Sequence, residues 1–131
     1  MTPDDLGMGW CVGRTKAFSW IGWRGMNRED CLKAERKQLV GLKPVDPNKV
    51  LPEGAQLVFD PKQSIPMTMV GHVTSSYMSS ALNYSLAMAL VKDGLKRIGE
   101  RVFAPLVDGS VIEAEIVSPV FYDPKGDRQN V

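Results

Sequence analysis

Short apolar runs alternate with groups of turn residues over most of the chain. Such runs, bounded by proline, glycine and aspartate, predict strands. In residues 111–117, Glu113 and Glu115 share one face of a strand, and Ile112, Ala114 and Ile116 share the other. The dipeptide Asp108-Gly109 before it is typical of a tight hairpin turn. The predicted strands are 38–42, 56–59, 67–74, 86–91, 101–106 and 111–117.

Six short strands joined by short links predict a mainly β fold. Closing the sheet removes its exposed edges, so we expect a small six-stranded antiparallel Greek-key barrel. Residues 75–80 are rich in serine and are predicted to be a loop, and residues 92–99 a charged connection. The run 86–91 could also be helical when taken alone. The positions expected to face the core are Leu39, Val58, Val70, Val73, Leu90, Val102 and Ile116.

The first 35 residues differ in character from the rest of the chain. They contain all three tryptophans, both cysteines and much of the glycine. Asn27 is a suitable N-cap, so a short helix is predicted over 27–36. Residues 10–26 are aromatic, rich in glycine and only weakly periodic. A segment this apolar normally packs against a surface, which a chain of 131 residues does not obviously provide.

Composition limits the classes of function. A chain of 131 residues with 44% hydrophobic and 24% charged residues is typical of one globular domain. A net charge of +1 is too small for a general nucleic-acid binder. No apolar stretch approaches the roughly 18 residues of a membrane span. The acidic start lacks the apolar core of a signal peptide, so we expect a cytoplasmic protein without nucleic-acid or membrane partners.

The residues that usually perform chemistry are few. His72 is the one histidine, and Cys11 and Cys31 are too widely spaced for a thioredoxin-like motif. A structural zinc site built from cysteine and histidine needs four ligands, so no metal site is predicted. We expect both cysteines to be reduced thiols. A cysteine–histidine pair formed in space stays open, although nothing in the local sequence indicates an activated cysteine.

Two further features have a functional and a structural interpretation. Glu113 and Glu115 could be an acid–base pair, but a solvated strand face explains them more simply, because no pocket is indicated around them. Trp20 and Trp23 could stack on a planar ligand such as a pterin, or could only pack or form an interface. The residues alone therefore predict no self-contained catalytic site.

Several motifs, taken in order, resemble one family. The stretches GHVTS, SSAL and LAMALV resemble the C-terminal barrel of the glycine-cleavage T-protein (aminomethyltransferase) superfamily. The opening TPDDLGMGW resembles the part of the family that closes the folate-binding region. Three further stretches are similar to the end of the alpha subunit of heterotetrameric sarcosine oxidase. The barrel motifs are residues 71–75, 79–82 and 86–91, and the opening motif is residues 2–10. The three stretches similar to the alpha subunit are residues 36–42, 51–57 and 120–126.

The resemblance implies a division of the chain and a role for it. Residues 1–35 would be the end of the folate-binding region, a linker and a short helix, and residues 36–131 the C-terminal β-barrel domain. The parent enzyme would demethylate sarcosine oxidatively and pass the one-carbon unit to tetrahydrofolate, with flavin and NAD bound elsewhere in the complex. Its catalytic aspartate lies in an N-terminal part that these residues do not include. We therefore expect a fragment of an enzyme that is inactive alone and has no catalytic residue.

The resemblance also implies partners and binding residues. The partners would be the N-terminal folate-binding part of the same polypeptide and the other sarcosine oxidase subunits. Arg14 and Lys16 fall near the family's basic residue on the folate, and Trp20 or Trp23 would touch its pterin ring. The alternative is a stand-alone small β-barrel that acts as a binding or interaction module without enzymatic activity.

Overall fold

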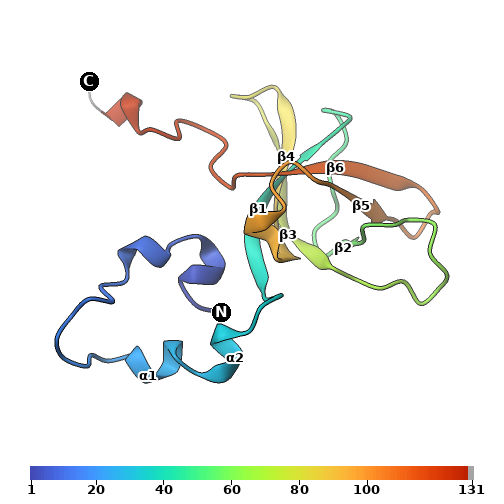
Figure 1. The fold of residues 1–131 in the computed structure, drawn as a ribbon. Coiled ribbons are helices and arrows are strands. Elements are labelled where there is room, and N and C mark those ends of the chain that lie inside the picture. The colour runs from blue at the N-terminus through green and yellow to red at the C-terminus, as the bar shows by residue number, and fades with distance from the viewer. Residues whose placement is uncertain (130–131) are drawn as a thin grey trace.

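The computed structural model describes residues 1–129 and contains one six-stranded antiparallel sheet (Figure 1). The strands β2, β3 and β4 pair in series, and β1 pairs with β4 on one side and β6 on the other. This order is a Greek-key arrangement and confirms the predicted fold. The strands are β1 (Lys37–Pro44), β2 (Gln56–Leu57), β3 (Gly71–Ser79), β4 (Tyr84–Lys92), β5 (Arg101–Pro105) and β6 (Val111–Val117).

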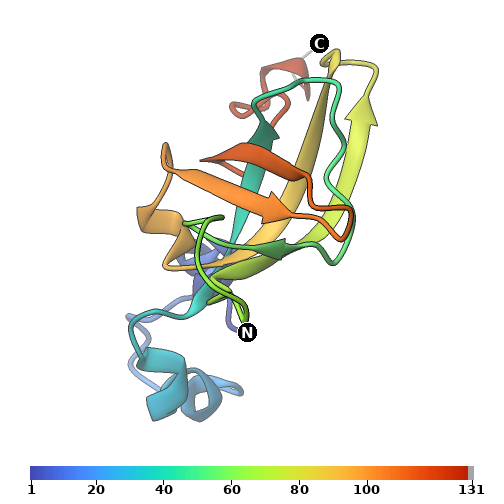
Figure 2. The same ribbon diagram turned by 90° about the vertical axis from the view of Figure 1, so that its right-hand side faces the viewer.

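The sheet curls until its two edge strands almost meet (Figure 2). A single bridge between Val58 and Phe103 joins the end of β2 to β5, with both backbone hydrogen bonds at 2.9 Å. Next along the seam stands Pro105, which has no N–H to donate, so the pairing stops there. The barrel is therefore nearly closed, as the edge argument predicted.

The core confirms part of the predicted set. Val58, Val73, Val102 and Ile116 are fully buried. Val70 is only half-buried and packs against the core from its edge.

The other two predicted core positions are wrong. Leu39 and Leu90 are half-buried and lie opposite each other on the outer face of the sheet. Their neighbours Val40 and Ala89, paired in the next row, fill the core instead. Because β1 and β4 are apolar on both faces, their hydrophobicity does not reveal which face is inside.

The serine-rich segment is a strand, which corrects the predicted loop at 75–80. The register shifts between Val73 and Ser75, and pairing then continues to Ser79. The hydroxyl of buried Ser76 donates to the carbonyl of Leu51 at 2.5 Å. Hydroxyl groups that find backbone partners are tolerated in a barrel wall, so the polar sequence does not end the strand. Residues 67–70, predicted to open this strand, lie before β3.

The short helix predicted over 27–36 is present but shorter than expected, as α2 (Glu29–Leu32). Another short helix, α1 (Trp23–Met26), precedes it and was not predicted. The side-chain amide of Asn27 donates to the Trp23 carbonyl at 2.8 Å, so this residue ends α1 and caps no helix start. Lys33 has an extended backbone with a ψ of 142°, so α2 ends at Leu32, and the left-handed φ of 61° at Glu35 prevents the helix from resuming before β1.

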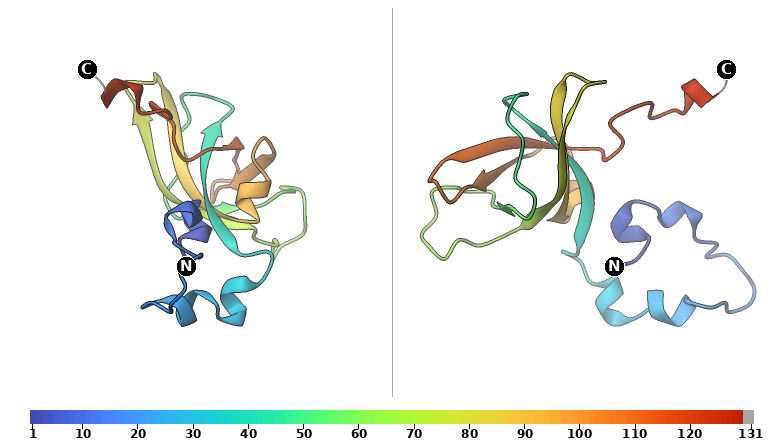
Figure 3. Two further views of the ribbon diagram at one scale, coloured as in Figure 1. Left: turned by 60° about the vertical axis from the view of Figure 1, so that its left-hand side comes forward. Right: turned by 180° about the vertical axis from the view of Figure 1, so that it is seen from behind.

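Short 3₁₀ turns complete the structure: η1 (Asp4–Leu6), η2 (Gly9–Cys11), η3 (Gly94–Lys96) and η4 (Asp127–Gln129). We call residues 1–35 the N-terminal segment and residues 118–129 the C-terminal arm. Both project from the same side of the barrel, beyond β1, and the β5–β6 hairpin points the opposite way (Figures 1 and 3). Within residues 1–129, no helix has the length and apolar character needed to cross a bilayer.

Candidate functional site

The sequence singled out four residues of the N-terminal segment, and the structure brings three of them together. The ammonium group of Lys16 lies 5.9 Å from the ring centroid of Trp20. The Trp20 and Trp23 rings meet edge to face, with centroids 5.9 Å apart and planes at 70°. This arrangement combines a cation with two aromatic rings, the groups that attract a planar, anionic ligand.

A tight turn produces this cluster. Gly22 has a φ of 95°, which favours glycine, and it stands directly before α1. The Trp23 amide donates to the Trp20 carbonyl at 3.1 Å, so the chain reverses within four residues. The local sequence Trp-Ile-Gly-Trp thus sets the positions of both rings.

The hollow at this cluster is too small for a whole cofactor. Its volume is about 190 Å³, and a second hollow of about 230 Å³ shares Lys16 and Trp20. Complete small-molecule sites usually enclose about 300–1,000 Å³. A cation beside two aromatic rings suits one wall of a site for a planar, anionic ligand, but these residues do not enclose such a ligand alone.

Arg14 is not part of this cluster. Its guanidinium forms an ion pair with Asp4, with the nitrogen and oxygen 2.5 Å apart. Both side chains are about half exposed, and such surface pairs contribute about 0–1 kcal/mol. The guanidinium is therefore available to a stronger anion at small cost.

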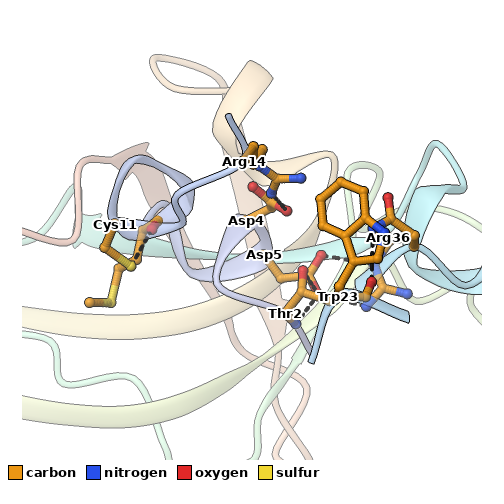
Figure 4. A network of polar contacts seen from close by, with 9 residues as sticks. Thr2, Asp4, Asp5, Cys11, Arg14, Trp23 and Arg36 are labelled. Atoms are coloured by element: carbon orange, nitrogen blue, oxygen red, sulfur yellow. Dashed lines mark hydrogen bonds and ion pairs between the residues drawn. The ribbon is translucent and has the colours of Figure 1, made fainter. Parts of the chain in front are cut away.

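Reasoning from the sequence missed a second polar cluster, which fixes the N-terminal segment to the barrel (Figure 4). Arg36, next to the start of β1, donates from Nε and a terminal nitrogen to the two carboxylate oxygens of Asp5, at 2.8 and 2.6 Å. The backbone N–H and hydroxyl of Thr2 also donate to Asp5, at 2.7 and 3.2 Å. We call Thr2, Asp5 and Arg36 the clamp.

The ion pair in the clamp is largely shielded from solvent and stabilises the charged form of Asp5. The Asp5 side chain is 3% exposed and the Arg36 side chain 23%. The hydrogen bonds from Arg36 lower the pKa of Asp5 from 3.8 to about 2, against the opposing effect of burial. Because the partners are 31 residues apart, no local motif indicates the contact.

The remaining candidates have structural roles. Glu113 lies on the outer face with one carboxylate oxygen 3.5 Å from Arg101, and Glu115 lies opposite the same arginine, so both carboxylates belong to a charged strand surface. His72 is half-buried in β3, opposite Leu90. Both cysteines are free thiols, as predicted. Across residues 1–129, no group of three potential metal ligands comes together.

Comparison with known proteins identifies the family to which the barrel belongs. The family described as the glycine cleavage T-protein C-terminal barrel domain matches residues 37–123. The chain belongs to this barrel-domain family. The match begins at the first residue of β1 and ends in the C-terminal arm, so it covers the whole barrel and leaves the N-terminal segment outside.

Several relatives extend over nearly the full chain. A sarcosine oxidase subunit alpha from Corynebacterium sp. (strain U-96) is 42% identical over 132 residues, which cover 99% of this chain and 13% of that protein. An aminomethyltransferase from Clostridium botulinum (strain Loch Maree / Type A3) is 30% identical, covering 95% of this chain and 31% of that protein. The homologues are thus enzymes of which the barrel is a C-terminal domain, as the resemblance predicted.

A solved structure agrees with this relationship. The glycine cleavage system aminomethyltransferase T from Bartonella henselae has a TM-score of 0.72 and 25% identity, over 93% of this chain and 32% of that one. The chain spans less than a third of the aminomethyltransferase it matches and about an eighth of the sarcosine oxidase subunit.

Proposed function

We propose that this barrel-family chain is the C-terminal, non-catalytic part of a sarcosine oxidase alpha subunit or a closely related folate-dependent enzyme. The observation that supports this most directly is the 42% identity to a sarcosine oxidase subunit alpha along 99% of the chain. The parent enzyme would demethylate sarcosine oxidatively and transfer the one-carbon unit to tetrahydrofolate. Flavin and NAD would be bound in other parts of that complex.

In this proposal the chain has two parts. Residues 1–35 are the end of the folate-binding region with its linker and short helix. Residues 36–131 are the C-terminal β-barrel domain, of which residues 130–131 lie outside the part that the structure describes. The family match from residue 37 supports the boundary at the start of the barrel. The partners are an N-terminal folate-binding part of the same polypeptide and the other subunits of the oxidase.

The residues that this chain would place near folate are Arg14, Lys16, Trp20 and Trp23. When bound, tetrahydrofolate would supply the acceptor for the one-carbon unit. Lys16 and the two tryptophans would form one wall against it and exclude water from that side. Arg14 would exchange Asp4 for an anionic group of the ligand, since its ion pair is exposed.

Calorimetric titration with 5-formyltetrahydrofolate tests this division of labour. A contact or two of about 1 kcal/mol each do not offset an association cost of at least about 4 kcal/mol. We therefore expect no micromolar binding by the isolated chain. Binding should appear when the chain is co-purified with the Corynebacterium alpha subunit truncated before the matched region.

The alternative, a stand-alone small barrel that binds ligands or partners without enzymatic activity, predicts the opposite pattern. Micromolar binding by these 131 residues alone, with no gain from the truncated subunit, would establish that alternative and overturn the proposal.

A further inference from the structure

The outer surface of the barrel has two chemically different faces. On β5 and β6 the outer face carries charged residues: Arg101 lies opposite Glu115 and 3.5 Å from Glu113, which lies opposite Phe103. On β1 and β4 the outer face is mainly apolar, although these strands also supply apolar residues to the core. On β3 the outer face carries Tyr77 together with polar His72 and Ser75, which lie opposite Leu90 and Met88. We call the second surface the apolar outer face. Its residues are Leu39, Gly41, Tyr77, Leu86, Met88 and Leu90.

The strand register makes this face continuous across β1 and β4, and on β3 the face includes Tyr77. Leu39 pairs with Leu90, Gly41 with Met88, and Leu86 with Tyr77. The three leucines and the methionine are half-buried, whereas Tyr77 is 60% exposed. A strand with one face in the core and the other in water usually alternates apolar and polar residues along its sequence, as β6 does at its centre. The apolar outer face is therefore built to be covered.

The C-terminal arm already covers one part of this face. A Cβ atom added at Gly41 would lie 2.5 Å from the Ser118 carbonyl oxygen and 2.6 Å from the Phe121 ring. The arm thus crosses the outer side of β1, and glycine is what permits its close approach. Beyond this contact, Val120 and Tyr122 are about half exposed. The arm extends the apolar outer face away from the barrel (Figure 1).

The N-terminal segment borders the same side. The clamp holds this segment to the start of β1, and η1 packs against that strand. Its exposed apolar side chains include Trp10 in η2, which is 83% exposed, and fully exposed Ile21. Figures 1 and 3 show the segment and the arm on one side of the barrel, flanking β1.

We propose that the apolar outer face, with the N-terminal segment and the C-terminal arm on either side, is the docking surface for the larger, preceding part of the parent polypeptide. The inference rests on the proposed function and deepens it by naming the surface. In the relatives the matched region is 13–31% of the protein and is C-terminal, so most of the polypeptide precedes it. That preceding chain would reach the barrel at residue 1, beside this surface. The charged outer face of β5 and β6 would stay in solvent.

The experiment is co-expression of this chain with the Corynebacterium sarcosine oxidase alpha subunit truncated before the matched region, followed by co-purification and an affinity measurement. Trp10→Lys and Tyr77→Lys change exposed side chains of the proposed surface, and each should weaken association at least tenfold. Val107→Lys is the matched control, because Val107 is also apolar and fully exposed but lies at the β5–β6 turn, on the far side of the barrel. It should bind like the unaltered chain.

The outcomes separate the two proposals. If the unaltered chain does not co-purify with the truncated subunit, the proposed function fails and the docking surface with it. If it does co-purify but Trp10→Lys and Tyr77→Lys bind as well as Val107→Lys, only the docking surface is wrong. Hydroxyl-radical footprinting gives a second reading: oxidation of Tyr77 and Trp10 should fall in the complex, and oxidation of Val107 should not change. Thermal melts followed by circular dichroism establish that each variant is folded.

Discussion

The clamp gives a quantitative prediction about how the N-terminal segment is held. The pKa of Asp5 falls from 3.8 to about 2 because Arg36 donates two hydrogen bonds to its carboxylate. At roughly 1.4 kcal/mol per pKa unit, the ionised carboxylate stabilises the attached segment by about 2 kcal/mol. The folded pKa lies below the unfolded one, so this stabilisation is fully present above about pH 4. It is lost as the pH falls from 3.8 to about 2.

The tryptophans make the effect measurable. Trp10, Trp20 and Trp23 all lie in the N-terminal segment, so tryptophan fluorescence reports this segment, whereas far-ultraviolet circular dichroism reports mainly the barrel. Titration to acid should change the fluorescence between about pH 4 and 2 before the barrel signal changes. In Asp5→Asn the fluorescence at neutral pH should already resemble that of a released segment, and the acid step should disappear.

The neighbouring carboxylate is the control. Asp4 forms only an exposed ion pair with Arg14, so Asp4→Asn should change segment stability by less than about 1 kcal/mol. An unchanged acid step in Asp5→Asn, or an equal effect of Asp4→Asn, would refute the reasoning about the clamp.

Three further predictions concern the barrel and the thiols. Gly41→Ala should destabilise the chain by about 1–3 kcal/mol in urea titration because its Cβ meets the C-terminal arm, whereas Gly25→Ala, which meets nothing within 4 Å, should be neutral or stabilising. Leu42→Ala should cost about 2–5 kcal/mol in the same assay, because Leu42 is completely buried in the core. Thiol titration of the unfolded chain without reductant should count two free cysteines, Cys11 and Cys31; a count of zero would contradict the structure.

The sequence predicted the buried face of a strand correctly where the outer face of that strand is polar, and incorrectly where the outer face is apolar. In β6 the alternation of glutamate with isoleucine and alanine defined both the strand bounds and the buried face correctly. In β1 and β4 both faces are apolar, because one is the core and the other the apolar outer face. Hydrophobicity then no longer distinguishes inside from outside, and Leu39 and Leu90 were assigned to the wrong side.

In the candidate site, contacts between residues close in sequence were predictable, whereas contacts between distant residues were not. Trp20 and Trp23 are held together by a turn within four residues, so their cluster with Lys16 was accessible from the sequence. The pairing of Asp5 with Arg36 spans 31 residues and depends on where the barrel begins. Both residues belong to charged stretches that also suit solvent, so no pattern predicts that one carboxylate is buried.

These contacts explain how a barrel without catalytic residues would influence the proposed enzyme. The clamp fixes one flanking segment to the start of β1, and the approach of Phe121 to Gly41 fixes the other to the middle of the same strand. The segment that the clamp holds also contains Lys16, Trp20 and Trp23, the residues proposed to face folate. A loss of about 2 kcal/mol at the clamp would let that wall move even though the barrel stays folded. Mutations in the clamp should therefore weaken folate binding by the reconstituted enzyme more than mutations of equal cost in the core, because the clamp is the buried ion pair that joins the segment holding those side chains to the start of β1.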